Sequence, residues 1–339
     1  MRHLIIIMVA LLAMECNVVA KDAATAVIFD TDMGNDIDDA LALDLLYKYQ
    51  DMGRIKLLGI MSSKKERESA QYIDVMSTWY GYRKTPIGIA RDGVKGELAT
   101  NYATKVVGMK VAGKPMLKRS IKDVGKLPDA HKLYRKLLAS QPDNSVVIIC
   151  TGFATNLGNL LSTAGDSYSP LNGRDLISRK VKQIVLMAGR FDNTGEAEYN
   201  VVNDIASCAK LFAESPVPVV TSPFELGLRV LFPGECIEKD FGWTALHPLV
   251  LGYKAFLKMP YDRPTWDLTA VLHVLEPGRF MSCTKPGRID VDEKGRTRYT
   301  PARDGKHSYL TATDEQRREM AEFFVEIISK KPKKFRIKD

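Results

Sequence analysis

The chain has 339 residues, of which 45% are hydrophobic and 8% aromatic, and it carries a formal net charge of +8. This length allows one large α/β domain, and the composition is that of a globular protein rather than a disordered or fibrous one. Part of the basic excess lies in the tail over residues 330–334, but no stacking aromatic side chains are interleaved with these charges. A nucleic-acid-binding surface is therefore disfavoured.

The first twenty residues differ from the rest of the chain. Arg2 and His3 precede an apolar run over residues 4–13, and Ala20 offers a small residue just before a cut. This pattern is typical of a secretory signal, and the run is too short for a membrane span. We therefore expect a signal peptide over residues 1–20 and a single exported domain over residues 21–339, either periplasmic or secreted.

A short apolar strand over residues 27–29 leads into a loop with five aspartates in ten residues. Like charges this close repel one another unless a cation neutralises them, and oxygen ligands suit Ca²⁺ or Mg²⁺ better than zinc. The apolar pattern that follows predicts a helix over residues 40–49. Capping of that helix would use one or two of the carboxylates, not five. The five are Asp30, Asp32, Asp36, Asp38 and Asp39.

Buried strands alternate with helical patterns along the rest of the chain. This alternation predicts βαβ crossovers, and therefore an α/β fold: a single domain with a mostly parallel, Rossmann-like sheet flanked by helices. Ligands bind beyond the carboxyl ends of such strands, where the polar clusters of this chain fall. The weakly patterned segment 91–128 could cross the mouth of the site. The predicted strands are 55–61, 87–90, 145–150, 181–187 and 217–220, and the predicted helices include 66–80, 131–139 and 204–212.

Four cysteines follow residue 20, and their wide spacing shows no zinc pattern. Cys150 and Cys208 lie in apolar patterns and are predicted to be buried thiols. A disulfide between Cys236 and Cys283 is compatible with an oxidising compartment, and the sequence leaves this pairing open.

The acidic loop resembles the N-terminal signature of the inosine-uridine-preferring nucleoside hydrolases, Asp-x-Asp-Pro-Gly-x-Asp-Asp-Ala after the first strand. Residues 30–34 and 38–40 match it, with two extra residues between the glycine and the aspartate pair. The resemblance covers about residues 25–330. It implies a Ca²⁺-dependent hydrolase that splits a nucleoside, or a related N-ribosyl compound, into base and ribose. It also implies a homodimer or homotetramer.

The resemblance implies a metal site and a catalytic base. Asp32, Asp39, Asp267 and the carbonyl of Thr151 would bind Ca²⁺, and Asp32 would also take a proton from the attacking water. Thr151 opens the segment 151–156, which is similar to the family's Thr-Gly-x-x-Thr-Asn turn. Asp267 stands at the start of a predicted helix, so its alternative role is that of a helix cap.

Several substrate contacts are also implied by the resemblance. Asp38 would bind a sugar hydroxyl, as would Glu198 and Asn200, whose strand-like alternation in Ala-Glu-Tyr-Asn predicts that both point to one pocket. Asn193, in the preceding loop, is a further candidate. Asp36 takes the place of Asp38 when the two-residue insertion is counted from the start of the loop. Continuity with the following helix favours Asp38.

Two departures from the family pattern concern the sugar and the leaving base. Lys64 follows the second strand, where the family has Gly-Asn, so Lys64 or Ser63 would substitute for the asparagine. Trp266 replaces the family's histidine beside the leaving base. Protonation of the base would then come from solvent, helped by stacking on Trp266, or from His247. A lone histidine beside a proline is more often structural.

Two alternative functions fit part of this pattern. Haloacid-dehalogenase phosphatases also place Asp-x-Asp after a first strand, which would assign phosphoryl transfer with Mg²⁺ to Asp30 and Asp32. That class needs a later acidic motif that is incomplete at Asp166, and it leaves Asp38 and Asp39 without a role. A secreted nucleoside- or sugar-binding protein without turnover is the second alternative, supported by the missing histidine and asparagine. The retained Asp32 argues against it, because binding alone needs no base.

Overall fold

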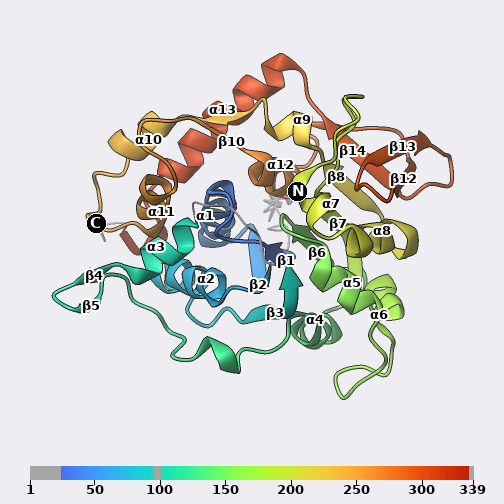
Figure 1. Ribbon diagram of the computed structural model, residues 1–339, viewed down its shortest axis with the longest axis horizontal. Coiled ribbons are helices and arrows are strands. Elements are labelled where there is room, and N and C mark those ends of the chain that lie inside the picture. The colour runs from blue at the N-terminus through green and yellow to red at the C-terminus, as the bar shows by residue number, and fades with distance from the viewer. Residues whose placement is uncertain (1–23, 95–100, 336–339) are drawn as a thin grey trace, which may run out of the picture.

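The computed structural model describes residues 24–94 and 101–335 (Figure 1). Its centre is a ten-stranded sheet. Seven neighbouring strands of this sheet run parallel, and the other three pair antiparallel. The predicted α/β class with a mostly parallel sheet is confirmed. In order across the sheet, the strands are β13 (Thr297–Pro301), β12 (Gly287–Val291), β14 (His307–Thr311), β8 (Val219–Ser222), β7 (Val181–Met187), β6 (Val146–Cys150), β1 (Thr25–Thr31), β2 (Ile55–Lys64) and β3 (Ile87–Val94), with β11 (Ser282–Cys283) paired to β14.

Helices cover both faces of this sheet (Figure 1). Successive strand residues point to opposite faces, so Phe29 and Ile149 belong to one hydrophobic core while Ile28 and Ile148 belong to the other. The first core is covered by α1 (Asp38–Asp51), α2 (Arg67–Tyr80), α11 (Pro248–Phe256), α12 (Trp266–Leu275) and α13 (Asp314–Ser329). The second is covered by α4 (Ala130–Ala139), α5 (Thr155–Leu161), α6 (Gly173–Lys180) and α8 (Ile205–Glu214).

The predicted elements of the first two thirds of the chain are present. Helices α1, α2, α4 and α8 occupy the predicted ranges to within two residues at either end, and β8 begins two residues later than predicted. β6 is the clearest case, because its Val-Val-Ile-Ile-Cys run is buried along its whole length, as expected of a central parallel strand. The sequence patterns did not reveal the C-terminal elements β11 to β14 and α13.

The segment expected to cross the mouth of the site takes a different course. It contains α3 (Tyr102–Gly108), the strand pair β4 (Lys110–Val111) and β5 (Lys114–Pro115), and the 3-10 helix η1 (Val124–Lys126). Helix α3 packs against α2 and α11. None of the described residues from 91 to 128 lines the pocket at the carboxyl ends of the strands.

The described residues include the four cysteines that follow residue 20 but not the N-terminal segment. The expected signal peptide, residues 1–20, lies outside them. No helix in the described ranges combines the length and apolarity needed to cross a bilayer. Cys150 and Cys208 are buried thiols as predicted. Cys236 and Cys283 are also free thiols, so the bridge between them that the sequence left open is not formed.

Candidate active site

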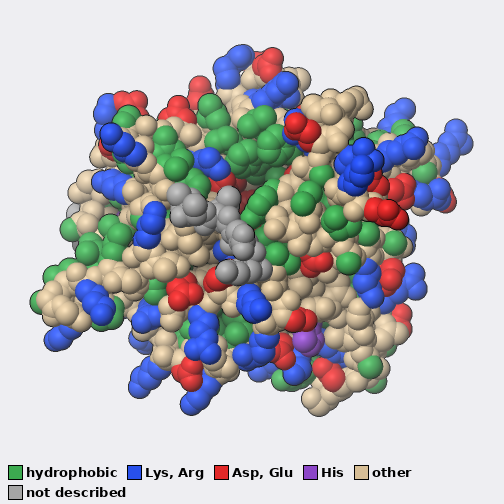
Figure 2. All heavy atoms as spheres, in the orientation of Figure 1, with side chains coloured by type: hydrophobic (Ala, Val, Ile, Leu, Met, Phe, Trp, Pro, Cys, Tyr) green, Lys and Arg blue, Asp and Glu red, His purple; other side chains and the backbone are tan. Residues whose placement is uncertain are grey.

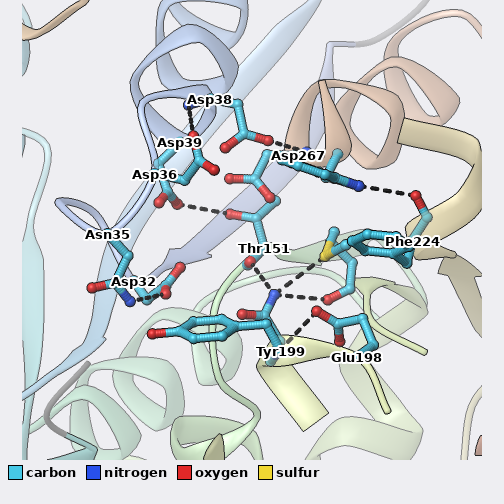
Figure 3. Close-up of a pocket in the computed structure, with 13 residues that line it drawn as sticks. Asp32, Asn35, Asp36, Asp38, Asp39, Thr151, Glu198, Tyr199, Phe224 and Asp267 are labelled. Atoms are coloured by element: carbon cyan, nitrogen blue, oxygen red, sulfur yellow. Dashed lines mark hydrogen bonds between the residues drawn. The ribbon is translucent and has the colours of Figure 1, made fainter. Parts of the chain in front are cut away.

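A pocket lies where the central strands end, and Figure 2 shows it as a hollow with hydrophobic side chains along one edge. Nine residues singled out from the sequence line it together, from four separate parts of the chain. Of the predicted site residues, Lys64, Asn193 and His247 do not line it. The lining residues are Asp32, Asn35, Asp36, Asp38, Asp39, Thr151, Met187, Glu198, Tyr199, Asn200, Phe224, Trp266 and Asp267 (Figure 3).

The acidic loop is shaped by its own hydrogen bonds. The Thr31 hydroxyl accepts a hydrogen bond from the backbone N–H of Met33 at 3.1 Å and donates one to Asp39. Helix α1 begins at Asp38, and its N-cap residue Ile37 makes no side-chain capping bond. Asp38 and Asp39 are nevertheless buried. Capping therefore does not explain these two carboxylates.

Within the described residues, four buried carboxyl groups of this pocket form no ion pair, whereas Asp36 pairs with Arg263. The four are Asp32, Asp38, Asp39 and Asp267. Burial raises the pKa of Asp38, Asp39 and Asp267 well above the usual 3.8, and the charge of neighbouring aspartates raises each of them further. Burial also raises the pKa of Asp32 to about 6, although the charge of Lys64 opposes this. Such a cluster is more stable when it holds protons or a bound cation than when all four carboxyl groups are ionised and unpaired.

These carboxylates are turned toward protein donors. Asp32 Oδ2 accepts a hydrogen bond from Asn35 Nδ2 at 2.5 Å, and Asp38 Oδ2 accepts one from the backbone N–H of Asp267 at 3.0 Å. In the part of the chain that the structure describes, no three Asp, Glu, His or Cys side chains already converge as a metal site. By their chemistry, however, oxygen-only ligands that repel one another in a buried pocket fit a hard cation.

Thr151, at the end of β6, connects the acidic loop to the sugar-binding candidates. Its backbone N–H donates to the carbonyl of Asp30 at 2.8 Å, and its own carbonyl accepts a hydrogen bond from Asn200 Nδ2 at 2.8 Å. Asp30 itself lies below the pocket, where Tyr134 and Asn156 donate hydrogen bonds to its carboxyl group at 2.9 and 3.0 Å. Asp30 thus supports the loop rather than lining the site.

Gly152 allows the turn after β6 to approach the end of β1. A Cβ at this position would lie 2.4 Å from the backbone nitrogen of Asp32 and 2.5 Å from Ser63 Oγ. We therefore expect Gly152→Ala to lower the free energy of unfolding by about 1–3 kcal/mol, measured by urea denaturation. The control is Gly108→Ala, where an added Cβ meets nothing within 4 Å. Equal unfolding free energies for the two variants would contradict this close approach.

The segment that carries Glu198 and Asn200 is a helix, not a strand. Glu198 caps the short helix α7 (Tyr199–Asn203) by accepting hydrogen bonds from the N–H groups of Asn200 at 2.8 Å and Val201 at 3.2 Å. The prediction of strand-like alternation was therefore wrong, although both side chains do reach the pocket. Burial raises the pKa of Glu198 to about 7.

Lys64 lies behind the pocket and acts on it through Asn35. Its ammonium group is buried and donates a hydrogen bond to Asn35 Oδ1 at 2.5 Å. Asn35 in turn donates to Asp32, so the three side chains form one chain of hydrogen bonds. The sequence does not reveal this role of Asn35, since its partner Lys64 lies 29 positions away.

Aromatic side chains form the other wall of the pocket. The rings of Phe224 and Trp266 stack with centroids 5.5 Å apart, and Trp266 Nε1 donates to the carbonyl of Phe224 at 2.9 Å. Asp36, at the edge of this wall, forms an ion pair with Arg263, whose Nε lies 2.7 Å from it. Phe224 and Arg263 were not identified from the sequence, because no local motif marks either of them.

His247 and Asn193 lie elsewhere. His247 is buried with its ring centroid 4.0 Å from that of Trp79, and its Nδ1 accepts a hydrogen bond from the N–H of Leu249 at the start of α11. Burial lowers its pKa well below 6.5, so it is a neutral structural side chain. Asn193 has φ = 61° in a turn beside a different surface pocket. The structure does not bring either residue to the acidic pocket.

The chain resembles known proteins along almost its whole length. The family model described as inosine-uridine preferring nucleoside hydrolase matches residues 27–334. Among solved structures, a plant nucleoside hydrolase is 17% identical, with a TM-score of 0.69 over 91% of this chain and 99% of that chain. A purine-preferring ribonucleoside hydrolase from Gardnerella vaginalis is 16% identical, with a TM-score of 0.66 over 90% and 98%.

An inosine-guanosine nucleoside hydrolase is 18% identical, with a TM-score of 0.66 over 90% of this chain and 97% of that chain. At these identities the structural similarities establish the fold alone. No curated protein matches the chain by sequence. The family model is the finding that spans the pocket, since its range includes every lining residue.

Proposed function

The chain belongs to the inosine-uridine preferring nucleoside hydrolase family, and from this premise we propose how its residues cleave the N-glycosidic bond of a nucleoside. It is an N-glycosyl hydrolase, which separates base from ribose. The observation that carries the residue assignments is the buried cluster of Asp32, Asp38, Asp39 and Asp267 in one pocket. The phosphatase alternative does not account for the family match.

We propose Ca²⁺ as the cofactor, held by the carboxylates of Asp32, Asp39 and Asp267 and by the carbonyl of Thr151. The support is the oxygen-only ligand set and the mutual repulsion of its carboxylates. When bound, the cation would lower the pKa of a neighbouring water and interact with the sugar hydroxyls.

The protein's own groups then carry out the reaction. Asp32, as a carboxylate, takes a proton from the water that attacks the anomeric carbon. Asp38 accepts a hydrogen bond from a sugar hydroxyl, while Glu198 and Asn200 orient the ring. The pocket's negative charge stabilises the positive charge that develops on the sugar as the bond to the base breaks.

Lys64 is proposed to tune Asp32. Burial raises the pKa of Asp32 to about 6, and the charge of Lys64 opposes that rise. Since the base must be deprotonated, kcat/KM should increase with pH as Asp32 loses its proton. Lys64→Met should move that increase to higher pH by about one unit. Lys65→Met, at the exposed neighbouring position, is the control. Superimposable pH profiles for Lys64→Met and the wild type would exclude this role.

We further propose that the protein is exported after cleavage near Ala20 and that it forms a dimer or tetramer. The first rests on the basic start and apolar run of residues 1–20, the second on the family. A mature N-terminus at Lys21 in the exported protein, determined by mass spectrometry, is expected. Sedimentation of the purified protein would give the oligomeric state.

The proposed function is tested by release of free ribose from a panel of purine and pyrimidine nucleosides. The mature protein, with Ca²⁺ or with a chelator, would be assayed for reducing sugar. We expect release that requires Ca²⁺ and is restored when Ca²⁺ is added back. If the folded protein binds Ca²⁺ but releases no ribose from any nucleoside, the binding-only alternative would replace hydrolysis of these substrates.

A further inference from the structure

The described lining of the pocket contains no basic side chain that could protonate a departing base. It holds six carboxyl groups but no histidine, lysine or arginine. The histidines in the described ranges lie elsewhere, at positions 131, 247, 273 and 307. A neutral purine or pyrimidine leaves with the bonding electron pair and is a poor leaving group unless it gains a proton.

Two further carboxyl groups of the pocket, those of Glu198 and Asp36, are engaged by other protein groups. Glu198 accepts hydrogen bonds from three backbone N–H groups, those of Gly189, Asn200 and Val201, at 2.8 to 3.2 Å. Asp36 is paired with the guanidinium of Arg263. Both groups are therefore held as acceptors.

The Tyr199 hydroxyl is the remaining ionisable donor among the described lining residues. Burial raises its pKa to about 12, so it is a weak acid at neutral pH. It can donate a hydrogen bond without transferring its proton.

The aromatic wall, in contrast, is suited to a positively charged ring. Tyr199 and Phe224 line the pocket together with its carboxyl groups (Figure 3). Trp266 also lines it. Aromatic faces attract cations, and this wall already does so: the guanidinium of Arg190 lies 4.7 Å from the Phe224 centroid and that of Arg263 lies 5.2 Å from the Trp266 centroid.

Neither of these arginines lines the pocket, and both are neutralised by carboxylates. Arg190 pairs with Asp192 and Glu196, and Arg263 pairs with Asp36. A cation that contacts the pocket side of this wall would therefore meet a described lining whose only charged side chains are acidic.

From this combination we propose that the pocket prefers ribosides whose base is already a cation, such as pyridinium ribosides. The proposal rests on the proposed hydrolase function and adds the class of leaving group. Water bonds to the anomeric carbon, and the electron pair of the breaking carbon–nitrogen bond neutralises the ring. Asp32 takes the proton of the water and passes it to solvent. The sum is cationic riboside plus water giving ribose, neutral base and one proton.

The test compares kcat/KM for three ribosides with the purified Ca²⁺-loaded protein. N-ribosylpyridinium has a cationic leaving group, p-nitrophenyl riboside has an activated leaving group without positive charge, and inosine needs protonation. We expect N-ribosylpyridinium to exceed inosine at least 100-fold and to exceed p-nitrophenyl riboside, with one proton released per turnover in a pH-stat.

The other possible outcomes distinguish failure of this proposal from failure of the proposed hydrolase function. Equal kcat/KM for inosine and N-ribosylpyridinium would overturn the proposal while leaving the hydrolase function intact. Rapid turnover of p-nitrophenyl riboside with none of N-ribosylpyridinium would overturn the selection for a cation. No turnover of any of the three by a folded protein would overturn the proposed function, and the present proposal with it.

Two variants at one position separate the missing acid from the aromatic wall. Trp266→His introduces an imidazole beside the leaving base, and Trp266→Phe keeps an aromatic face without a titratable group. We expect Trp266→His to narrow the preference for N-ribosylpyridinium over inosine at least tenfold, and Trp266→Phe to leave it within threefold of its original value. Circular dichroism and Ca²⁺ binding would verify the fold. The same preference in both variants would contradict the proposal.

Discussion

Asp32→Asn is expected to lower kcat for ribose release by about a thousandfold, since general-base catalysis contributes on the order of 10²–10⁴. An amide cannot take the proton of the attacking water, but it has nearly the same shape as a carboxyl group. It also retains an oxygen that can accept the hydrogen bond from Asn35. With Ca²⁺ at a concentration that saturates the variant, the loss should therefore reflect the missing base rather than folding or metal binding. Single-turnover measurements of ribose release would separate the chemical step from product release.

The control for this substitution is Asp290→Asn, on the exposed surface of β12. It should keep the wild-type kcat, and both variants should keep the wild-type circular dichroism spectrum. An Asp32→Asn protein that retained a tenth or more of the wild-type kcat would remove Asp32 from the role of base, and another carboxyl group of the pocket would have to be considered.

Ca²⁺ binding is expected to stabilise the protein and to release protons. Burial and mutual repulsion raise the pKa of Asp38, Asp39 and Asp267 well above 3.8, so the metal-free cluster holds protons at mildly acidic pH. Metal binding needs deprotonated ligands, so affinity should fall as pH is lowered from 7 to 5. At a free Ca²⁺ concentration of 100 times Kd, the stabilisation would be about 2.7 kcal/mol.

Calorimetry in two buffers of different ionisation enthalpy would count the released protons, and thermal unfolding with and without a chelator would measure the stabilisation. Asp39→Asn should weaken Ca²⁺ binding at least tenfold, because it removes a charged ligand, whereas Asp290→Asn should not change it. Identical unfolding midpoints with Ca²⁺ and with chelator would rule out a Ca²⁺ site in this pocket.

The acidic loop could be predicted because all its information is local. A buried strand, a dense group of aspartates and the start of a helix follow one another within about twenty residues. The parallel order of β1, β6 and β7 then brings their carboxyl ends together, as the alternation of strands and helices implied. Thr151, which directly follows β6, could be predicted as a site residue because it lies at one of these strand ends.

Other parts of the site depend on contacts between distant residues, which no local pattern reveals. Lys64 reaches Asn35, and Arg263 pairs with Asp36 across 227 positions. Helix α7 has only five residues, too few to show a helical period. Its start depends instead on the cap supplied by Glu198. The burial of His247 among aromatic rings likewise needed the three-dimensional structure.

The Asp36–Arg263 pair also clarifies the two-residue insertion. Asp36 is neutralised by the guanidinium of Arg263, whereas the Asp38 carboxyl group accepts a hydrogen bond from the uncharged backbone N–H of Asp267. This difference supports the assignment of the sugar contact to Asp38, in the register continuous with α1.

The carboxylates of the acidic pocket come from segments that lie far apart in the sequence. Asp38 and Asp39 are made early in synthesis, whereas Asp267 and Arg263 follow more than 220 residues later. At about 5–20 residues per second, a ribosome needs on the order of ten seconds or more to supply that second half. Until then the acidic loop lacks Asp267, the proposed metal ligand, and Arg263, which pairs with Asp36. The proposed Ca²⁺ site would thus be completed late in maturation, once the two distant parts of the chain have come together.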